Sequence, residues 1–163
     1  MPFSAKAVAN EFLELAKAEG RQLTPMGVIK LTYLAHGWYL ALAGEPLLDE
    51  NVEAWRFGPV VPSLYHEFKE FGNGPITRSA RINPIWNRPA TLTGDGSGYA
   101  KKVIKRVWEV YKHLTAVQLS NLTHEPNSPW TQTPNKEIHG TDISNHVIRQ
   151  YFANLAVPNE QQA

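Results

Sequence analysis

The hydrophobic pattern of the N-terminal part of the chain predicts two helices. The first extends from a cap at Ser4 to Gly20 and places its apolar side chains on one stripe, so it is amphipathic. The second begins at Thr24-Pro25, a capping residue followed by proline at the first helical position. It is predicted to run to about Ala43, where a glycine and a proline end it.

The second predicted helix is unusual because apolar side chains cover almost every direction around its axis. Only Lys30, Thr32 and His36 are clearly polar between residues 25 and 43. A helix that is hydrophobic all round is typical of the middle of a domain. We therefore expect it to be the central core helix.

Four further helices and one extended segment follow. Helices are expected from Pro62 or Ser63 to Gly72, over residues 99–113, from a Thr115/Gln118 capping box, and from a cap at Ser144. Residues 51–57 are expected to be extended, with a turn at Gly58-Pro59. The expected fold class is therefore mainly α: a compact single domain of about six helices around a buried central helix, with one small two-stranded β element.

The last long helices are expected to be amphipathic. For residues 99–113 the predicted buried face is Val103, Val107, Val110 and Leu114, with Trp108 partly buried at its border. The basic side chains opposite this face are interpreted as a solvated surface, so a nucleic-acid partner is not expected. For the last helix the predicted buried residues are Val147, Ile148, Tyr151, Phe152 and Leu155.

Composition narrows the class of protein further. The 163 residues suit one domain, and the absence of cysteine excludes disulfides, thiolate zinc sites and a cysteine nucleophile. The formal net charge is only +1, which gives no broad nucleic-acid footprint. Neither a signal peptide nor a membrane span is evident, so a cytoplasmic protein without cofactors or metals is expected.

Candidate catalytic groups are isolated in the sequence. His36, His66 and His124 match no metal-ligand spacing, and His124-Glu125 is the one pair that would suit a hydrolase. The favoured interpretation is that His36 is a hydrogen-bonded core residue and that His66 and His124 order loops. GDGSG at 94–98 lacks the lysine of a phosphate-binding loop and is interpreted as a flexible entry to the next helix.

Two stiff aromatic segments stand out, WRFGPVVPSLY at 55–65 and THEPNSPW at 123–130. One interpretation is structural, since proline and glycine set turns and aromatic residues are common in cores. The other is recognition, because a proline-stiffened aromatic surface loses little conformational entropy on binding. The long Gly/Pro/Asn/Thr-rich stretch at 72–98 is expected to hold a short strand or to serve a partner.

The chain resembles the Panacea antitoxin domain family, which includes SocA-type antitoxins and phage-associated proteins. The resemblance lies in KLTYLAHGWYLALAGEPLLDENVEAWRFGPVVPSLYHEFKEFG at 30–72, LSNLTHEPNSPW at 119–130 and ISNHVIRQYF at 143–152. It implies a domain over residues 1–157, followed by a polar tail at 158–163.

The resemblance also implies a non-enzymatic antitoxin that neutralises the toxin of a neighbouring gene by direct binding. Alternatives are an adaptor that delivers the toxin to the ClpXP protease, a phage-associated accessory protein, or the His124/Glu125 hydrolase. The expected partner-binding residues come from the two aromatic segments: Trp55, Phe57, Gly58, Pro59, Val60, Pro62, Tyr65, His124, Pro129 and Trp130.

Overall fold

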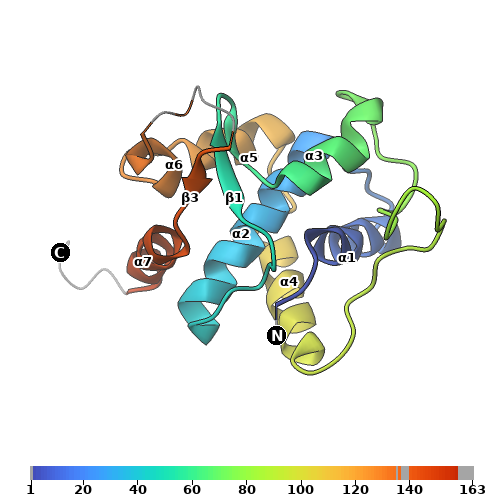
Figure 1. Cartoon of the computed structure of the whole chain (residues 1–163), viewed down its shortest axis with the longest axis horizontal. Coiled ribbons are helices and arrows are strands. Elements are labelled where there is room, and N and C mark those ends of the chain that lie inside the picture. The colour runs from blue at the N-terminus through green and yellow to red at the C-terminus, as the bar shows by residue number, and fades with distance from the viewer. Residues whose placement is uncertain (1, 135, 137–139, 158–163) are drawn as a thin grey trace.

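The computed structural model of the chain describes residues 2–134, 136 and 140–157, and it is mainly helical (Figure 1). The elements, in chain order, are α1 (Ala5–Ala18), α2 (Pro25–Ala43), β1 (Val52–Trp55), β2 (Gly58–Val60), α3 (Pro62–Phe68), the 3₁₀ turn η1 (Lys69–Phe71), α4 (Ser97–Tyr111), α5 (Ala116–Thr123), α6 (Pro129–Gln132), β3 (Asp142–Ile143) and α7 (Asn145–Ala156). The predicted fold class is confirmed, and the predicted tail at 158–163 lies outside the described residues.

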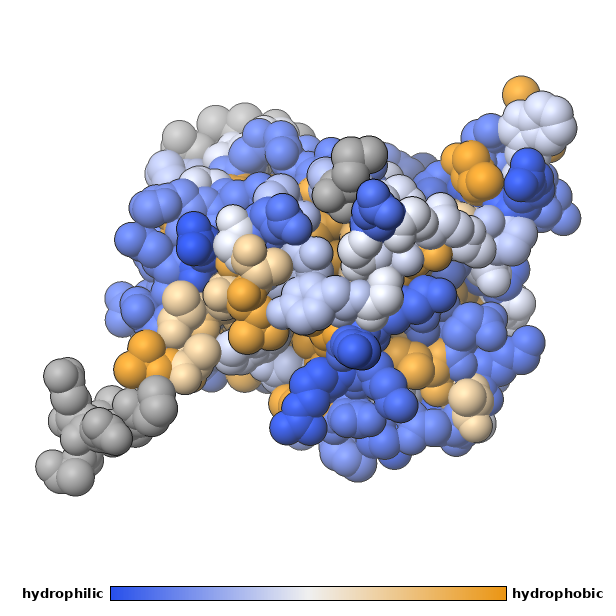
Figure 2. All heavy atoms as spheres, turned by 90° about the horizontal axis from the view of Figure 1, so that it is seen from below, coloured by the Kyte–Doolittle hydropathy of each residue, from blue (hydrophilic) through white to orange (hydrophobic). Residues whose placement is uncertain are grey.

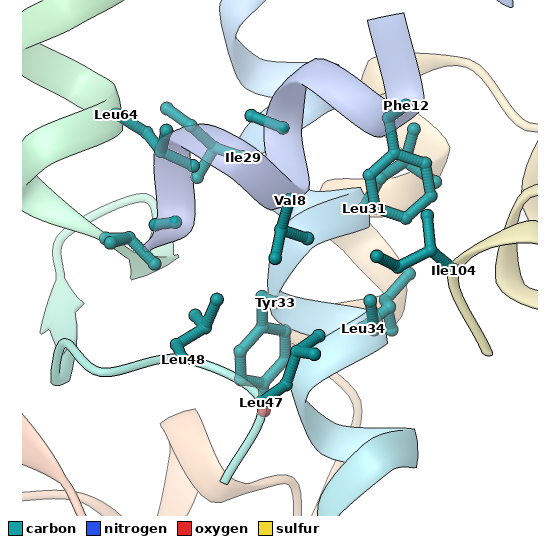
Figure 3. Packing of buried hydrophobic residues seen from close by; sticks show 14 of the residues in the cluster. Val8, Phe12, Ile29, Leu31, Tyr33, Leu34, Leu47, Leu48, Leu64 and Ile104 are labelled. Carbon is teal, nitrogen blue, oxygen red and sulfur yellow. The ribbon is translucent and has the colours of Figure 1, made fainter. Parts of the chain in front are cut away.

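Helix α2 is the centre of the domain, as its all-round hydrophobicity predicted. It packs against α1, α3, α4, α5 and α7. Side chains from α1, α3, α4 and the segment after α2 converge on it, among them Phe12, Leu64 and Ile104 (Figure 3). All three are fully buried. Because α2 is covered from several sides, it needs no polar face, and its few polar residues must find partners inside the protein.

The predicted helix ends are confirmed where the sequence has a capping residue. The side chains of Ser4, Thr24 and Ser144 each accept a hydrogen bond from a backbone N–H in the first turn of the following helix. Thr115 and Gln118 form the reciprocal bonds of a capping box at the start of α5. Gly44 ends α2 in the left-handed conformation, with φ of 74°.

The small sheet has three strands in the order β2-β1-β3, all antiparallel, where a two-stranded element was expected. The prediction of a turn at Gly58-Pro59 was wrong. Trp55 pairs with Gly58 and Ala54 with Pro59, so the two-residue turn is Arg56-Phe57. Pro59 is compatible with a strand here because β2 lies at the edge of the sheet, where a missing N–H costs little.

Several predicted helix faces need correction. Trp108 is buried rather than at a border, because α1 packs beside α4 and the indole N–H donates to the carboxylate of Glu19 at the end of α1. Val110 and Leu155 are half exposed, at 50% and 54%. The four-residue α6 was not predicted, although Ser128-Pro129 carries the same start signal as Thr24-Pro25.

The connection between α3 and α4 is held against the domain by Asn10. The buried Asn10 amide donates to the carbonyls of Ala80 (2.9 Å) and Ala90 (2.8 Å), and its oxygen accepts from Ala80 N–H (2.7 Å). A single β-bridge joins Arg81 and Pro89, where a short strand was one of the two expectations for this stretch. This connection lies at the right of Figure 1, and the right-hand end of the molecule bears a projection in Figure 2.

No helix among the described residues is both long enough and apolar enough to cross a membrane.

Candidate partner-binding groove

A groove of about 960 Å³ opens beside the β1–β2 hairpin. We call it the hairpin groove. Its lining comes from the start of α2 (Pro25, Met26, Ile29 and Lys30), from the hairpin (Trp55, Arg56, Phe57 and Val60), from α3 and the residues after it (Tyr65, Lys69, Gly72 and Asn73), and from Lys136. A volume of this size is within the range of ligand-binding clefts.

The hairpin supplies the aromatic wall of the groove. Because the turn has only two residues, both Arg56 and Phe57 project into solvent, and Phe57 is 69% exposed. The guanidinium of Arg56 lies 5.5 Å from the centre of the Phe57 ring. Behind them Trp55 and Tyr65 meet edge to face, with ring centres 5.0 Å apart. An exposed aromatic residue on a fixed frame is a typical anchor for protein recognition.

Lys30 lies at the inner side of the groove and is almost completely buried, at 2% exposure. Its Nζ donates to the carbonyls of Phe57 (3.2 Å) and Pro59 (2.9 Å), so it ties the hairpin to α2. Burial lowers the pKa of Lys30 from 10.5 to about 7, since desolvation disfavours the charged amine. Sequence reasoning did not identify Lys30 as a site residue, although it is the one charged residue in an otherwise apolar helix.

The other expected partner-binding residues do not line the groove, and several of them hold the hairpin in place. Trp130 Nε1 donates to the carbonyl of Trp55 (2.7 Å), and the ring of His124 meets the Trp130 ring edge to face at 4.2 Å. Gly58 has a φ of 116°, and a Cβ there would lie 2.7 Å from Lys30 Nζ and 3.0 Å from His124 Cε1. Only glycine fits at position 58, because of this backbone conformation and these close neighbours.

The ten predicted residues therefore divide into two groups. Trp55, Phe57, Val60 and Tyr65 line the groove. Gly58, Pro59 and Pro129 are buried, Pro62 occupies the first turn of α3, and His124 and Trp130 brace the hairpin from α5 and α6. The second group holds the frame for the first. Arg56, Lys69 and Met26 were not predicted, because their position on one wall depends on the hairpin register and on the packing of α2 against α3.

The histidines are separated in space. His36 is a core residue, as expected: its Nδ1 accepts from Leu48 N–H (3.3 Å), so Nε2 carries the proton and donates to Asn145 Oδ1 (2.9 Å). Burial lowers the pKa of His36. His124 Nδ1 donates to the Ser120 carbonyl (2.6 Å) and orders the end of α5.

His66 lies exposed on α3, within the helix that was predicted to begin at Pro62 or Ser63. Among the described residues no three His, Asp or Glu side chains gather as metal ligands would.

Two comparisons with known proteins place the chain in a family. The sequence pattern of one family, described as antitoxin SocA-like, Panacea domain, matches residues 28–131, which include the hairpin, α3 and the bracing residues of α5 and α6. A curated relative is 33% identical over 129 residues, which are 77% of this chain and 68% of the relative. No solved structure matches the chain significantly.

The chain therefore belongs to a family of antitoxins, the SocA-like proteins with a Panacea domain. The curated relative is antitoxin SocA of Caulobacter vibrioides (strain NA1000 / CB15N).

Proposed function

We propose that this protein is an antitoxin that neutralises a cognate toxin, the product of a neighbouring gene, by binding it directly at the hairpin groove. One observation carries the choice of surface: the exposed residues of the aromatic segment converge on a single groove, and the remaining motif residues brace it. Direct binding requires no catalytic group, cofactor or metal.

The frame of the groove suits recognition for a physical reason. Lys30 holds the carbonyls of Phe57 and Pro59, and Trp130 holds the carbonyl of Trp55. Because the hairpin is fixed before the partner arrives, little conformational entropy remains to be lost on binding. Met26, Phe57 and Tyr65 line the groove and are 38%, 69% and 42% exposed, so they offer contact area to a partner.

The test is protection of growing cells from the toxin. The neighbouring reading frame is expressed alone and together with this protein, in hosts with and without ClpXP. Direct neutralisation predicts protection in both hosts. Protection only in hosts that contain the protease would indicate the proteolytic adaptor instead, and a harmless neighbour would remove the basis of the proposal.

Matched variants locate the surface. Phe57→Ala is expected to weaken the complex by about 2 kcal/mol, as for an exposed aromatic anchor, and to reduce protection. Trp86→Ala removes an aromatic side chain of similar exposure, 60%, from the α3–α4 connection and is expected to leave binding unchanged. Loss of binding in Trp86→Ala with full binding in Phe57→Ala would place the toxin on the wrong side of the molecule for this proposal.

A further inference from the structure

The hairpin groove carries basic side chains and, among the described residues, no carboxylate. Its lining includes Lys30, Arg56, Lys69 and Lys136 but neither aspartate nor glutamate. The whole chain has 16 basic and 15 acidic residues, so this excess of one sign is local to the groove. The charge at this site is thus unlike the near-neutral protein around it.

The basic side chains of the groove are also not neutralised by neighbours. In the described part of the chain, every ion pair between a basic and an acidic side chain uses other lysines and arginines, and Lys30, Arg56 and Lys69 take part in none of them. Lys136 lies over the Trp130 ring at 4.7 Å and donates to the carbonyl of Thr133.

The arrangement of α3 and η1 separates the two signs of charge. Glu67 and Glu70 pair with Arg78, which belongs to the α3–α4 connection, whereas Tyr65 and Lys69, four residues apart, line the groove. Glu53 accepts from Trp55 Nε1 (2.9 Å) and does not line the groove. The carboxylates nearby in sequence therefore lie elsewhere, and the groove is left with an unbalanced positive charge.

We infer that the groove receives an acidic segment of the toxin. One aromatic or aliphatic side chain of that segment lies against Met26 and Phe57, and flanking Asp or Glu carboxylates lie against Arg56 and Lys69. This inference rests on the proposed function and adds the chemistry of the partner. The apolar wall favours a peptide over a nucleic acid, because a phosphate backbone would leave these apolar side chains unused.

Charge complementarity of this kind acts mainly on association and is screened by salt. The double variant Arg56→Gln/Lys69→Gln is expected to bind the toxin about tenfold more weakly than the parent at about 50 mM salt and nearly equally at about 500 mM, mostly through the association rate. Arg56→Glu/Lys69→Glu is expected to lose about 100-fold at low salt. Lys102→Gln/Lys105→Gln, which removes two exposed charges of α4, is the control and is expected to bind as the parent does.

Zero-length cross-linking with a carbodiimide tests the contact itself, because it joins only amines and carboxylates that touch. The expected product is an amide between Lys69 and an Asp or Glu of the toxin, identified by mass spectrometry of the purified complex. Lys69→Arg keeps the charge and should keep binding while losing this cross-link.

A complex that depends on Phe57 but shows no groove cross-link and the same salt dependence in parent and groove variants would overturn the acidic-segment inference and leave the proposed function standing. Absence of any complex would overturn both. Binding of DNA by the purified protein that is lost in Arg56→Gln/Lys69→Gln would assign the charge to nucleic acid and also refute the inference.

Discussion

Gly37 is the position where the packing of α2 against α7 is most directly testable. A Cβ at Gly37 would lie 2.2, 2.4 and 2.6 Å from Cε2, Cδ2 and Cζ of Phe152. Carbon atoms in contact prefer about 3.5–4.0 Å, so the ring would have to retreat by more than about 1 Å. It has little room, since Tyr33, Trp38 and Tyr151 surround it with ring centres 5.3–5.9 Å away.

The expected change in stability of Gly37→Ala follows from two opposing contributions. Replacing glycine by alanine inside a helix normally stabilises by about 1 kcal/mol. Overpacking a closed core costs about 1–3 kcal/mol, and a forced shift of an enclosed aromatic ring belongs at the upper end. We therefore expect Gly37→Ala to lower the free energy of unfolding by about 2 kcal/mol.

The assay is urea unfolding at 25 °C, followed by tryptophan fluorescence, with midpoint and slope compared between variants. Gly98→Ala is the matched control. Gly98 also lies in a helix, and nothing stands within 4 Å of its Cβ position, so alanine there should stabilise by about 0.5 kcal/mol. Opposite signs for the two glycines are the central expectation.

A double-mutant cycle attributes the effect to the ring. Phe152→Leu is expected to cost stability alone, yet the double variant Gly37→Ala/Phe152→Leu should be at least about 1 kcal/mol more stable than the sum of the single effects. A Gly37→Ala protein as stable as the parent, or strictly additive effects, would refute the close packing of α2 and α7 at this point.

Three further predictions concern buried polar contacts. Because the pKa of Lys30 is about 7 in the folded protein and 10.5 ordinarily, the unfolded state binds more protons between these values, and stability rises with pH. Relative to Lys30→Met, the parent should gain about 2 kcal/mol from about pH 7 to pH 9 in urea unfolding, and parallel pH profiles would contradict this. Asn10→Ala leaves backbone groups of Ala80 and Ala90 unpaired, so we expect the free energy of unfolding to fall by about 2–3 kcal/mol. Limited proteolysis within residues 73–96 should become faster, and unchanged cleavage would show that Asn10 does not hold this segment. Trp38→Ala should lower the free energy of unfolding by about 3 kcal/mol, since the half-buried ring packs on Phe152 and its N–H donates to Tyr111 Oη (2.9 Å). Trp38→Phe should lose only the contribution of the hydrogen bond, and thermal unfolding of both variants measures the difference.

The helices were predictable because their signals are local. A cap such as Ser4 or Thr115 lies within one turn of the N–H that it satisfies, so neighbouring residues suffice to locate the helix start. The apolar surface of α2 likewise shows in the sequence that the helix is enclosed, without showing by what.

The errors arose where distant segments decide the outcome. Trp108 is buried by the end of α1, and its indole N–H meets Glu19, far away in sequence. The hairpin turn was predicted at Gly58-Pro59 but lies at Arg56-Phe57. Trp130 binds the Trp55 carbonyl before this turn, and Lys30 binds the Pro59 carbonyl after it. No pattern within residues 51–62 contains these partners.

The candidate site shows the same division. Its aromatic residues were identified from the stiff segment at 55–65, but its cations were not. Arg56 lies in that segment, whereas Lys69 and Lys136 come from other parts of the chain. The pairing of β1 with β2 and the packing of α3 against α2 bring Arg56 and Lys69 to the same groove. Charge along the chain is balanced, so the local excess has no trace in the composition.

The two-residue turn of the hairpin has a consequence for how this fold can be diversified. The residues that hold the strands, Lys30, Gly58 and Trp130, all lie outside the turn, while Arg56 and Phe57 bear exposed side chains. The two turn residues can therefore be replaced by other residue pairs while the hydrogen bonds that hold the hairpin remain. A display library randomised at these two positions, selected against unrelated proteins, would turn this small cysteine-free domain into a source of new binders.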